Sequence, residues 1–438
     1  MSAIDPSIYE YINIESLEKR TIDIKALCAS IDYYEDIYSP TLTAKIVVIN
    51  TGQSIKGPDG KLTSLYTGLP LRGGERVCMK INGNTQKNPG LEFLEEDVDN
   101  YLYVSSITNV IKTSMVETFV LNLVSREALT NETSRVGEKY IGLKVEKVVG
   151  TLIKEKLLSQ KPYDFDDSES TYSFIGNLRK PFHVITWLAS KCIPGNSGTG
   201  GEDSTAGYCF FETKSGYNFK SIDGLISSEP VGDSYFYSEV PGNDDNKIIK
   251  YSIDENQDLI GKLRKGSYCT YRMYFDPLNC TFIQKTFTSD DYLGKARTTG
   301  EKPLLPKLAE GDSDRDIGDS PSRITTAVLD RGTFDEKVST KENDLKPMRT
   351  QAQAAMRYNL ITTQTLSMMI PSNTSLEAGN IIKCEFPVTT VKEEGTSIDT
   401  VVTGLYMIRA LCHHFDADGS YTSLELIKDT LGEQEKDG

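Results

Sequence analysis

The chain has 438 residues, of which 38% are hydrophobic and 25% charged, so its composition is that of a folded globular protein and not of a disordered one. At this length we expect about two to four domains, each with its own hydrophobic core. The formal net charge of −15 argues against a general DNA-binding surface, which would need a stripe of basic residues.

The sequence shows no targeting signal and no disulfide pattern. Residues 1–6 lack the charged and apolar regions of a secretory signal. No apolar stretch approaches the roughly 18 residues that span a bilayer, so we expect no membrane anchor. Scattered cysteines without a C-x-x-C pair favour reduced, mostly buried thiols; they are Cys28, Cys78, Cys192, Cys209, Cys269, Cys280, Cys384 and Cys412. We expect a protein that is made in the cytoplasm.

Residues 1–127 carry repeated strand signals. The stretch 41–49 has the β-branched bias of a buried strand, and 75–81 alternates apolar with polar residues. Two more strands are predicted at 101–110 and 115–124. This part of the chain is therefore predicted to be a β-barrel or β-sandwich, the first tube domain.

The strand predicted at 115–124 is apolar on both faces. Phe119, Leu121 and Leu123 share one face, whereas the other carries three valines, Val116, Val120 and Val124. A strand of this kind is covered on both sides, either by a helix or by a neighbouring subunit.

Residues 128–240 change from strand to helix periodicity and are predicted to form an α+β domain. Apolar residues at helical spacing predict a helix over 145–152, and a second helix starts at Pro181 and ends at 193–195. After a loop rich in Gly, Ser and Thr, residues 208–221 form two aromatic runs that predict a β-hairpin.

The tip of this hairpin is predicted at Lys214 and Ser215, which places Phe210 opposite Phe219. The aromatic side chains are expected to pack under the helix that carries the only tryptophan of the chain. The hairpin core is thus predicted to be structural and to consist of Trp187, Phe210, Phe211, Tyr217 and Phe219.

Residues 241–287 are predicted to form a helix followed by a strand pair. Asp254 is expected to cap the helix, and Gly266 to end it. Residues 288–344 are rich in Asp, Gly, Pro, Ser and Thr, and we expect them to form a long, mobile surface excursion.

The rest of the chain returns to strand patterns. Residues 345–430 are predicted to be the closing part of a second β-barrel tube domain, with an apolar-polar stretch from Met356 to Ile370. A last hairpin is predicted from strands at 401–414 and 421–428, and residues 431–438 form a solvated tail.

Few residues have the chemistry of a catalytic or metal site. His183 is expected at a helix end, and the adjacent His413 and His414 point to opposite faces of a strand and cannot chelate one ion together. The sequence around Asp416 lacks the glycine and glutamate of a calcium loop, so a hairpin turn suffices there. Glu212 is expected to be a surface residue at a strand end.

The acidic run Asp312, Asp314 and Asp316 also lacks these calcium-loop residues, which favours a solvated acidic loop. There is no nucleophile elbow, phosphate loop or dinucleotide fingerprint. We therefore expect no catalytic residue, no metal and no cofactor, and infer a structural or binding protein rather than an enzyme.

The hairpin and the segments around it carry motifs that occur together in one protein family. The hairpin agrees with the pattern F-x-E-T-x-x-G-F-x-F-x-S-I-x-x-L at Phe211, Glu212, Thr213, Gly216, Tyr217, Phe219, Ser221, Ile222 and Leu225. The flanking motifs are Trp187-Leu188-Ala189, Gly266-Ser267-Tyr268, Leu376-x-x-Gly379-x-x-Ile382 and Gly404-Leu405-Tyr406-x-Ile408. In this order they resemble the baseplate central hub proteins of contractile-tailed, T-even-like bacteriophages, over most of the chain.

The resemblance implies a mainly β fold with an α+β insertion, in which two barrel-like tube domains and a helix-and-hairpin domain assemble as a trimeric ring. Such a homotrimer adapts the six-fold tail tube to the three-fold central spike within the virion. Its partners would be the spike protein, tail tube or tube-initiator proteins and the tape-measure protein. DNA would pass through the channel without specific binding, since an acidic lumen repels it; acidity that serves only solubility is equally compatible with the sequence.

Two features depart from the family pattern. Residues 288–344 carry no family motif, so their role stays open between decoration and a contact with another baseplate protein. The chain has no glycine-repeat or lysozyme-like extension, so the spike is expected to be a separate chain.

The alternative from another class is a β-rich virion-associated protein that binds or hydrolyses glycans. A pair of carboxylates in a deep groove lined with exposed Tyr and Trp would favour it. A continuous apolar face for subunit contact would favour the hub, in which the hairpin aromatics form the core of a small domain that braces the ring.

Overall fold

The computed structural model describes residues 4–52, 55–57, 60–85, 88–94, 100–169, 171–195, 205–240, 242, 244–255, 257–277, 280–293, 296–300, 317–328, 346–388 and 398–431. The fold is mainly β with an α+β part in the middle of the chain, as predicted. No helix within these residues combines the length and the apolar character needed to cross a membrane.

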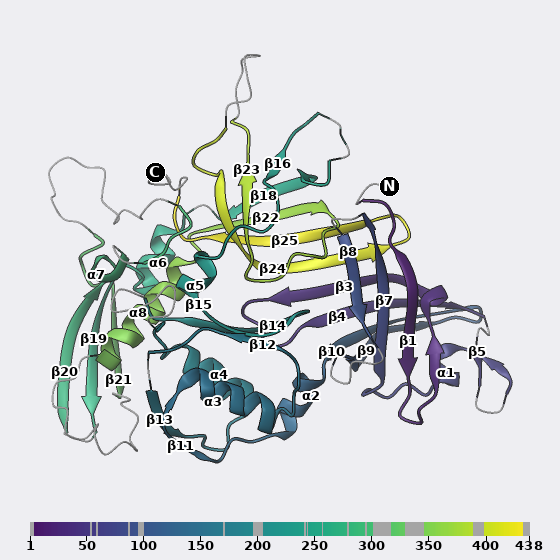
Figure 1. Ribbon diagram of the computed structural model, residues 1–438, viewed down its shortest axis with the longest axis horizontal. Coiled ribbons are helices and arrows are strands. Elements are labelled where there is room, and N and C mark those ends of the chain that lie inside the picture. The colour runs from purple at the N-terminus through teal and green to yellow at the C-terminus, as the bar shows by residue number, and fades with distance from the viewer. Residues whose placement is uncertain are drawn as a thin grey trace.

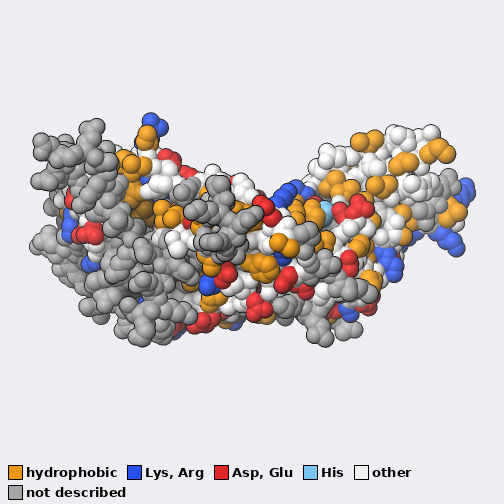
Figure 2. Space-filling model, turned by 90° about the horizontal axis from the view of Figure 1, so that it is seen from above, with side chains coloured by type: hydrophobic (Ala, Val, Ile, Leu, Met, Phe, Trp, Pro, Cys, Tyr) orange, Lys and Arg blue, Asp and Glu red, His pale blue; other side chains and the backbone are white. Residues whose placement is uncertain are grey.

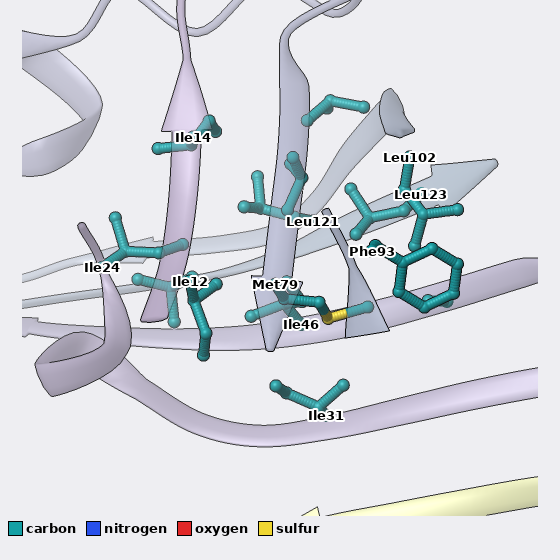
Figure 3. Packing of buried hydrophobic residues seen from close by; sticks show 14 of the residues in the cluster. Ile12, Ile14, Ile24, Ile31, Ile46, Met79, Phe93, Leu102, Leu121 and Leu123 are labelled. Atoms are coloured by element: carbon teal, nitrogen blue, oxygen red, sulfur yellow. The ribbon is translucent and has the colours of Figure 1, made fainter. Parts of the chain in front are cut away.

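The first β module, residues 8–125, surrounds one hydrophobic core. Its strands are β1 (Ile8–Glu15), β2 (Thr21–Asp23), β3 (Cys28–Asp36), β4 (Thr43–Thr51), β5 (Ile55–Lys56), β6 (Leu62–Thr63), β7 (Arg76–Thr85), β8 (Asn88–Phe93), β9 (Leu102–Lys112) and β10 (Val116–Ser125), with short helices η1 (Lys25–Leu27) and α1 (Leu65–Gly68). Figure 3 shows side chains from several of these strands, among them Ile46, Met79 and Leu121, filling the same interior. The strands predicted at 41–49 and 115–124 are confirmed.

The helix–hairpin domain follows, over residues 126–226. Its elements are α2 (Arg126–Thr133), β11 (Lys139–Lys144), α3 (Val145–Thr151), the π-helical turn η2 (Leu152–Lys156), β12 (Tyr163–Phe165), β13 (Thr171–Ile175), α4 (Pro181–Ala189), β14 (Tyr208–Thr213), β15 (Gly216–Ser221) and α5 (Ile222–Ile226). Pro181 is the first residue of α4, where its missing N–H costs no hydrogen bond. The helices predicted over 145–152 and from Pro181 correspond to α3 and α4 and are confirmed.

The second β module consists of strands from the later part of the chain. They are β16 (Tyr235–Tyr237), β17 (Lys247–Ile248), β18 (Lys250–Glu255), β22 (Gln364–Pro371), β23 (Ile381–Glu385), β24 (Gly404–Asp416) and β25 (Ser420–Lys428). The predicted final hairpin is β24–β25. In its turn the Asp416 carboxylate accepts hydrogen bonds from the backbone N–H groups of Asp418 and Gly419, so the acidic sequence there builds a turn.

The peripheral sheet packs against two helices at one end of the molecule. Its elements are α6 (Leu259–Lys265), β19 (Cys269–Asp276), β20 (Thr281–Thr288), α7 (Asp290–Leu293), β21 (Arg323–Val328) and α8 (Lys346–Leu360). Tyr274 and Phe287 of the sheet share a core with Met348, Ala352 and Met356 of α8. Figure 1 shows this unit and the first β module at opposite ends, with the helix–hairpin domain between them.

Two local predictions in this region are wrong. Asp258, not Asp254, caps α6, because its carboxylate accepts a hydrogen bond from Gly261 N at 2.8 Å, whereas Asp254 lies in β18. The stretch that begins at Met356 does not start as a strand. It continues α8 to its last residue, and β22 starts only at Gln364.

The predicted surface excursion, residues 288–344, is partly built into the fold. β21 pairs in parallel with β19, and Thr298 and Thr299 are buried. Thr299 N and Oγ1 donate hydrogen bonds of 2.9 and 2.7 Å to Asp429 near the end of the chain. The run from Asp312 to Asp316 lies outside the described residues.

Candidate functional site

Two strands from distant parts of the chain join the two β modules into one sheet. β3 and β24 pair antiparallel, from Asp36 opposite Ala410 to Ser30 opposite Asp416. The eight strands run in the order β18-β22-β25-β24-β3-β4-β10-β9, four from each module, and every neighbouring pair is antiparallel. We call this the shared sheet and the β3–β24 junction its seam; Figure 1 shows the strands at the seam side by side.

Within the described residues, β18 is open along one side, and β9 is open along one side beyond its first residues. β9 pairs with β10, and its other side meets β7 only at its first residues. From Ser105 to Lys112 every side chain of β9 is exposed except that of the half-buried Ile107. β18 pairs with β22 alone, and all of its side chains except Tyr251 are exposed. An open edge of this kind is a template for pairing with another chain.

The outer face of the shared sheet carries apolar side chains that the chain itself leaves partly open. In β10 Phe119, Leu121 and Leu123 are buried inside the module, as their alternation predicts. The outward valines of the same strand, at 116, 120 and 124, are only half-buried. Ile49 of β4 and Ile111 of β9 flank this strand and are 42% and 63% exposed.

Charged pairs cross the seam on the outer face. His414 Nδ1 lies 2.5 Å from Asp32 Oδ1, and its Nε2 lies 2.9 Å from Asp416 Oδ2. Burial alone would lower the pKa of His414, but hydrogen bonds to these two carboxylates and their charge raise it above its usual value. Arg409 forms a second link, with Nη1 3.1 Å from Asp36 Oδ2 and with Nη2 paired to Glu425.

His413, the neighbour of His414, points into the interior, which agrees with the prediction that the two rings lie on opposite faces. Burial, with a contribution from Lys214, lowers the pKa of His413 to about 3. His183 is exposed in the first turn of α4. Within the residues that the structure describes, no cluster of His, Cys, Asp or Glu could hold a metal ion. All eight cysteines are free thiols, and Cys280 is exposed.

The five residues of the predicted hairpin core lie in two separate clusters. Phe210 pairs opposite Phe219, with Lys214 and Ser215 at the tip. Phe210, Tyr217 and Phe219 pack on the helices of their own domain. Phe211 points to the other face, into a cluster with residues of the second β module that includes Met407. The hairpin is therefore buried on both faces and connects the two units.

Trp187 lies at the margin of this core. It is only partly buried, and its ring packs edge-on against Tyr172 and Phe174, with centroid distances of 5.5 and 5.4 Å. Helix α4, which carries Trp187, packs on the hairpin through Phe182 instead. The ring centroid of Phe182 is 5.9 Å from that of Phe210.

The largest departure from the sequence prediction in this domain is Glu212. It was expected at the surface, but its side chain is fully buried and forms an ion pair with Lys161. Strand β14 is covered on both faces, so no position along it reaches solvent. The seam residues Asp32 and His414 were also not predicted as a pair, because nothing local in the sequence relates them.

A groove of about 490 Å³ lies on the outer face of the second β module. Its lining residues include the small Ser367, Ala410 and Ser423 and the aromatic Tyr34 and Tyr251. Glu425 is the one carboxylate among its lining residues. A glycan hydrolase would need a second carboxylate beside it. In the coloured part of the face shown in Figure 2, acidic and hydrophobic side chains are mixed, without a continuous basic patch.

Comparison with known proteins relates the chain to others through its fold. No model of a protein family matches it, and no curated protein matches its sequence. The crystal structure of a tail protein from Neisseria meningitidis MC58 superimposes with a TM-score of 0.54 at 10% identity, over 96% of each chain. The 43 kDa tail protein of prophage MuSo2 from Shewanella oneidensis has a TM-score of 0.54 at 7% identity, over 96% of this chain and 98% of that one.

The chain therefore shares its fold with these two tail proteins over nearly its whole length. Because both alignments also cover almost all of the other chain, the likeness includes the β modules and the helix–hairpin domain together.

Proposed function

We propose that the chain is a structural virion protein, the central hub of a phage tail baseplate, which assembles as a homotrimeric ring. In this role it joins the six-fold tail tube to the three-fold spike and lets DNA pass. The fold that it shares with two tail proteins supports a role in a phage tail. The observation that carries the ring is the shared sheet, in which one side of β18, and one side of β9 from Ser105 to Lys112, pairs with no strand of the described chain.

The directions of the strands make the two edges compatible. Strand direction alternates across the shared sheet, and because the number of strands is even, β9 and β18 run in opposite directions. The open side of β18 in one copy can therefore pair antiparallel with β9 of the next copy, as β3 pairs with β24 within the chain. A head-to-tail contact of this type closes into a ring when its rotation permits.

The barrel-like tube domains, the copy number of three and the partners come from the resemblance to hub proteins. The partners are the spike, the tail tube or its initiator, and the tape-measure protein. The charge of −15 per copy favours passage of DNA without binding, since like charges in the lumen repel the phosphate backbone. The protein acts in the virion after assembly in the host cytoplasm, without catalysis and without a cofactor.

Disulfide trapping tests the proposed contact. We would introduce Ser106→Cys on β9 and Ser252→Cys on β18, both exposed, in a Cys280→Ser background that removes the exposed native thiol. These positions lie on opposite edges of one sheet, so a disulfide between them joins two copies. Oxidation is expected to give dimers and trimers, with no larger species.

A matched control replaces Ser106→Cys with Thr326→Cys, an exposed position on β21 of the peripheral sheet. This variant is expected to stay uncrosslinked. The closed trimer would be contradicted if the protein stays monomeric with several β9–β18 pairs even when its candidate spike protein is added. Crosslinking into a series of species larger than three copies would contradict it as well.

A further inference from the structure

One buried side chain of β3 contacts all three units at the place where the hairpin tip meets the two β modules. Glu35 Oε1 accepts a hydrogen bond of 2.8 Å from Tyr33 Oη and one of 2.7 Å from Lys214 N, at the tip of the hairpin. Glu35 Oε2 accepts one of 2.9 Å from Ala378 N, in the segment between β22 and β23 of the second β module. We call this contact the three-unit junction.

Other hydrogen bonds hold the same units together without Glu35. Thr374 N and Oγ1 donate hydrogen bonds of 3.2 and 2.7 Å to Asn88 Oδ1 of β8. Lys214 Nζ donates to Thr374 O, and Ser215 Oγ pairs with Glu377. A substitution at Glu35 therefore leaves the three-unit junction with several of its links.

The carboxyl group of Glu35 is buried without a cation beside it. Within the part of the chain that the structure describes, its donors are neutral: two backbone N–H groups and one phenol. The ammonium group of Lys214 lies 3.8 Å from the carboxylate of Glu377 instead. A buried carboxylate without a cation is costly, and a proton removes its charge. The hydroxyl of Tyr33 can rotate and accept that proton in a hydrogen bond, since a phenol is both donor and acceptor.

The groups around Glu35 favour its protonated form. Burial is the largest cause and raises the pKa of Glu35 to about 7, with the charge of Glu377 adding to the rise. The three hydrogen bonds act in the opposite direction and offset only part of it. Burial and nearby carboxyl groups, among them Glu212, raise the pKa of Tyr33 well above its usual value. His413, whose ring stacks on that of Tyr33 at 6.0 Å, has a pKa lowered to about 3 by burial, so neither ring changes its charge near neutral pH.

We propose that Glu35 binds one proton in the folded protein near neutral pH, and that this proton holds the hairpin tip and the second β module on β3. The protonated carboxyl group donates to Tyr33 Oη and still accepts from the backbone of Lys214 and Ala378. When the proton leaves, a buried carboxylate without a cation remains, and the three-unit junction becomes weaker.

Opening of the three-unit junction therefore depends on pH. A glutamate in the opened or unfolded chain has its ordinary pKa of 4.5, below the value of about 7 for Glu35 in the folded protein. The stabilising effect of the proton is complete below the ordinary pKa. It decreases up to about tenfold per pH unit above that value and is lost once pH has risen through about 7.

Hydrogen exchange of the full-length protein tests this at the three-unit junction, because the amides of Lys214 and Ala378 are donors to Glu35. Protection of these amides, corrected for the intrinsic exchange rate, is expected to fall roughly tenfold between about pH 5.5 and about pH 7.5. Glu35→Gln removes the titrating group, so its protection should not fall in this way. His414, whose pKa is also raised, is present in both proteins, so the difference between them isolates Glu35.

A second variant tests the assignment without changing Glu35. Glu377→Gln removes a neighbouring charge that raises the pKa of Glu35, so the fall in protection should end at a lower pH than in the parent. Glu385→Gln is the control, because this half-buried glutamate of β23 pairs with Lys383, and it should behave like the parent.

Carbon NMR of the protein labelled at its glutamate carboxyl carbons gives a direct readout. One resonance is expected to titrate with a midpoint at about pH 7 and to be missing in Glu35→Gln. The proposal would be overturned if no resonance that this substitution removes titrates near pH 7, or if protection falls equally in the parent and Glu35→Gln. If Glu35→Gln does not fold, an unshifted pH dependence in Glu377→Gln would overturn it.

Discussion

His414 of β24 faces Asp32 of β3 across the seam, with the imidazole Nδ1 2.5 Å from the carboxylate. The two residues are 382 positions apart in the sequence. Their contact joins the end of the chain to its beginning and lies where the two β modules become one sheet.

Replacing His414 should weaken the protein in a pH-dependent manner. Because Asp32 and Asp416 raise its pKa, the charged imidazole contributes stability that is complete below its usual pKa of 6.5. That contribution is lost as pH rises through the raised value. His414→Gln is expected to cost about 1–2 kcal/mol at about pH 6 and much less at about pH 9, measured by urea unfolding. His183→Gln, at an exposed site, is the control. A loss that is the same at both pH values would contradict this account.

Removing the buried guanidinium of Arg357 should be far more costly. It is fully buried between Asp223 and Asp429, so Arg357→Ala leaves two carboxylates without their cation. We expect a loss of about 3–5 kcal/mol in unfolding free energy. Lys250→Ala, at an exposed position of β18, should have little effect in the same assay. A loss of less than about 1 kcal/mol for Arg357→Ala would contradict this account, because it would mean that the two buried carboxylates do not need the guanidinium.

The hairpin core should depend on Phe219 for its stability. Its side chain is fully buried, and its ring centroid lies 4.8 Å from that of Tyr208. Phe219→Ala is expected to reduce the unfolding free energy by about 3–5 kcal/mol, because it leaves a cavity that the hairpin cannot close. Phe282→Ala is the matched control, since that ring is 73% exposed on the peripheral sheet. Similar losses for the two variants would contradict the assignment of the core.

Charges on the open edges should prevent assembly and leave the fold of one copy intact. Ile111 of β9 is 63% exposed and Ile253 of β18 is 39% exposed, so Ile111→Lys and Ile253→Lys bury no charge within a single chain. Both variants are expected to give monomers with a near-native unfolding transition. Val328→Lys, on the peripheral sheet, should still assemble. If both variants assemble like the parent protein, then β9 and β18 do not form the contact between copies.

Local signals in the sequence predicted the hairpin well. The two aromatic runs indicate the two strands. Gly216 marks the turn between them, because it adopts a φ of 129° that other residues avoid. The end of α6 was equally clear from Gly266, whose φ is 71°. Helix α8 was missed, although its run of Ala, Gln, Met and Arg favours a helix and could have been recognised.

The site itself was largely beyond sequence reasoning. The apolar residues on both faces of β10 predict that this strand is covered on both sides. They do not indicate which residues cover its outer face. The seam pairs β3 with β24, and periodicity carries no information on such distant partners. Glu212 was misplaced for the same reason, since burial of β14 depends on two units that meet only in the folded chain.

The measurement that tests the central claim most directly is the mass of the purified protein by light scattering, at several salt concentrations, alone and with its candidate spike protein. The account predicts a trimer, or a monomer that becomes a trimer when the spike is added. A protein that stays monomeric under all these conditions would contradict the ring and leave the glycan-binding or hydrolytic alternative ahead.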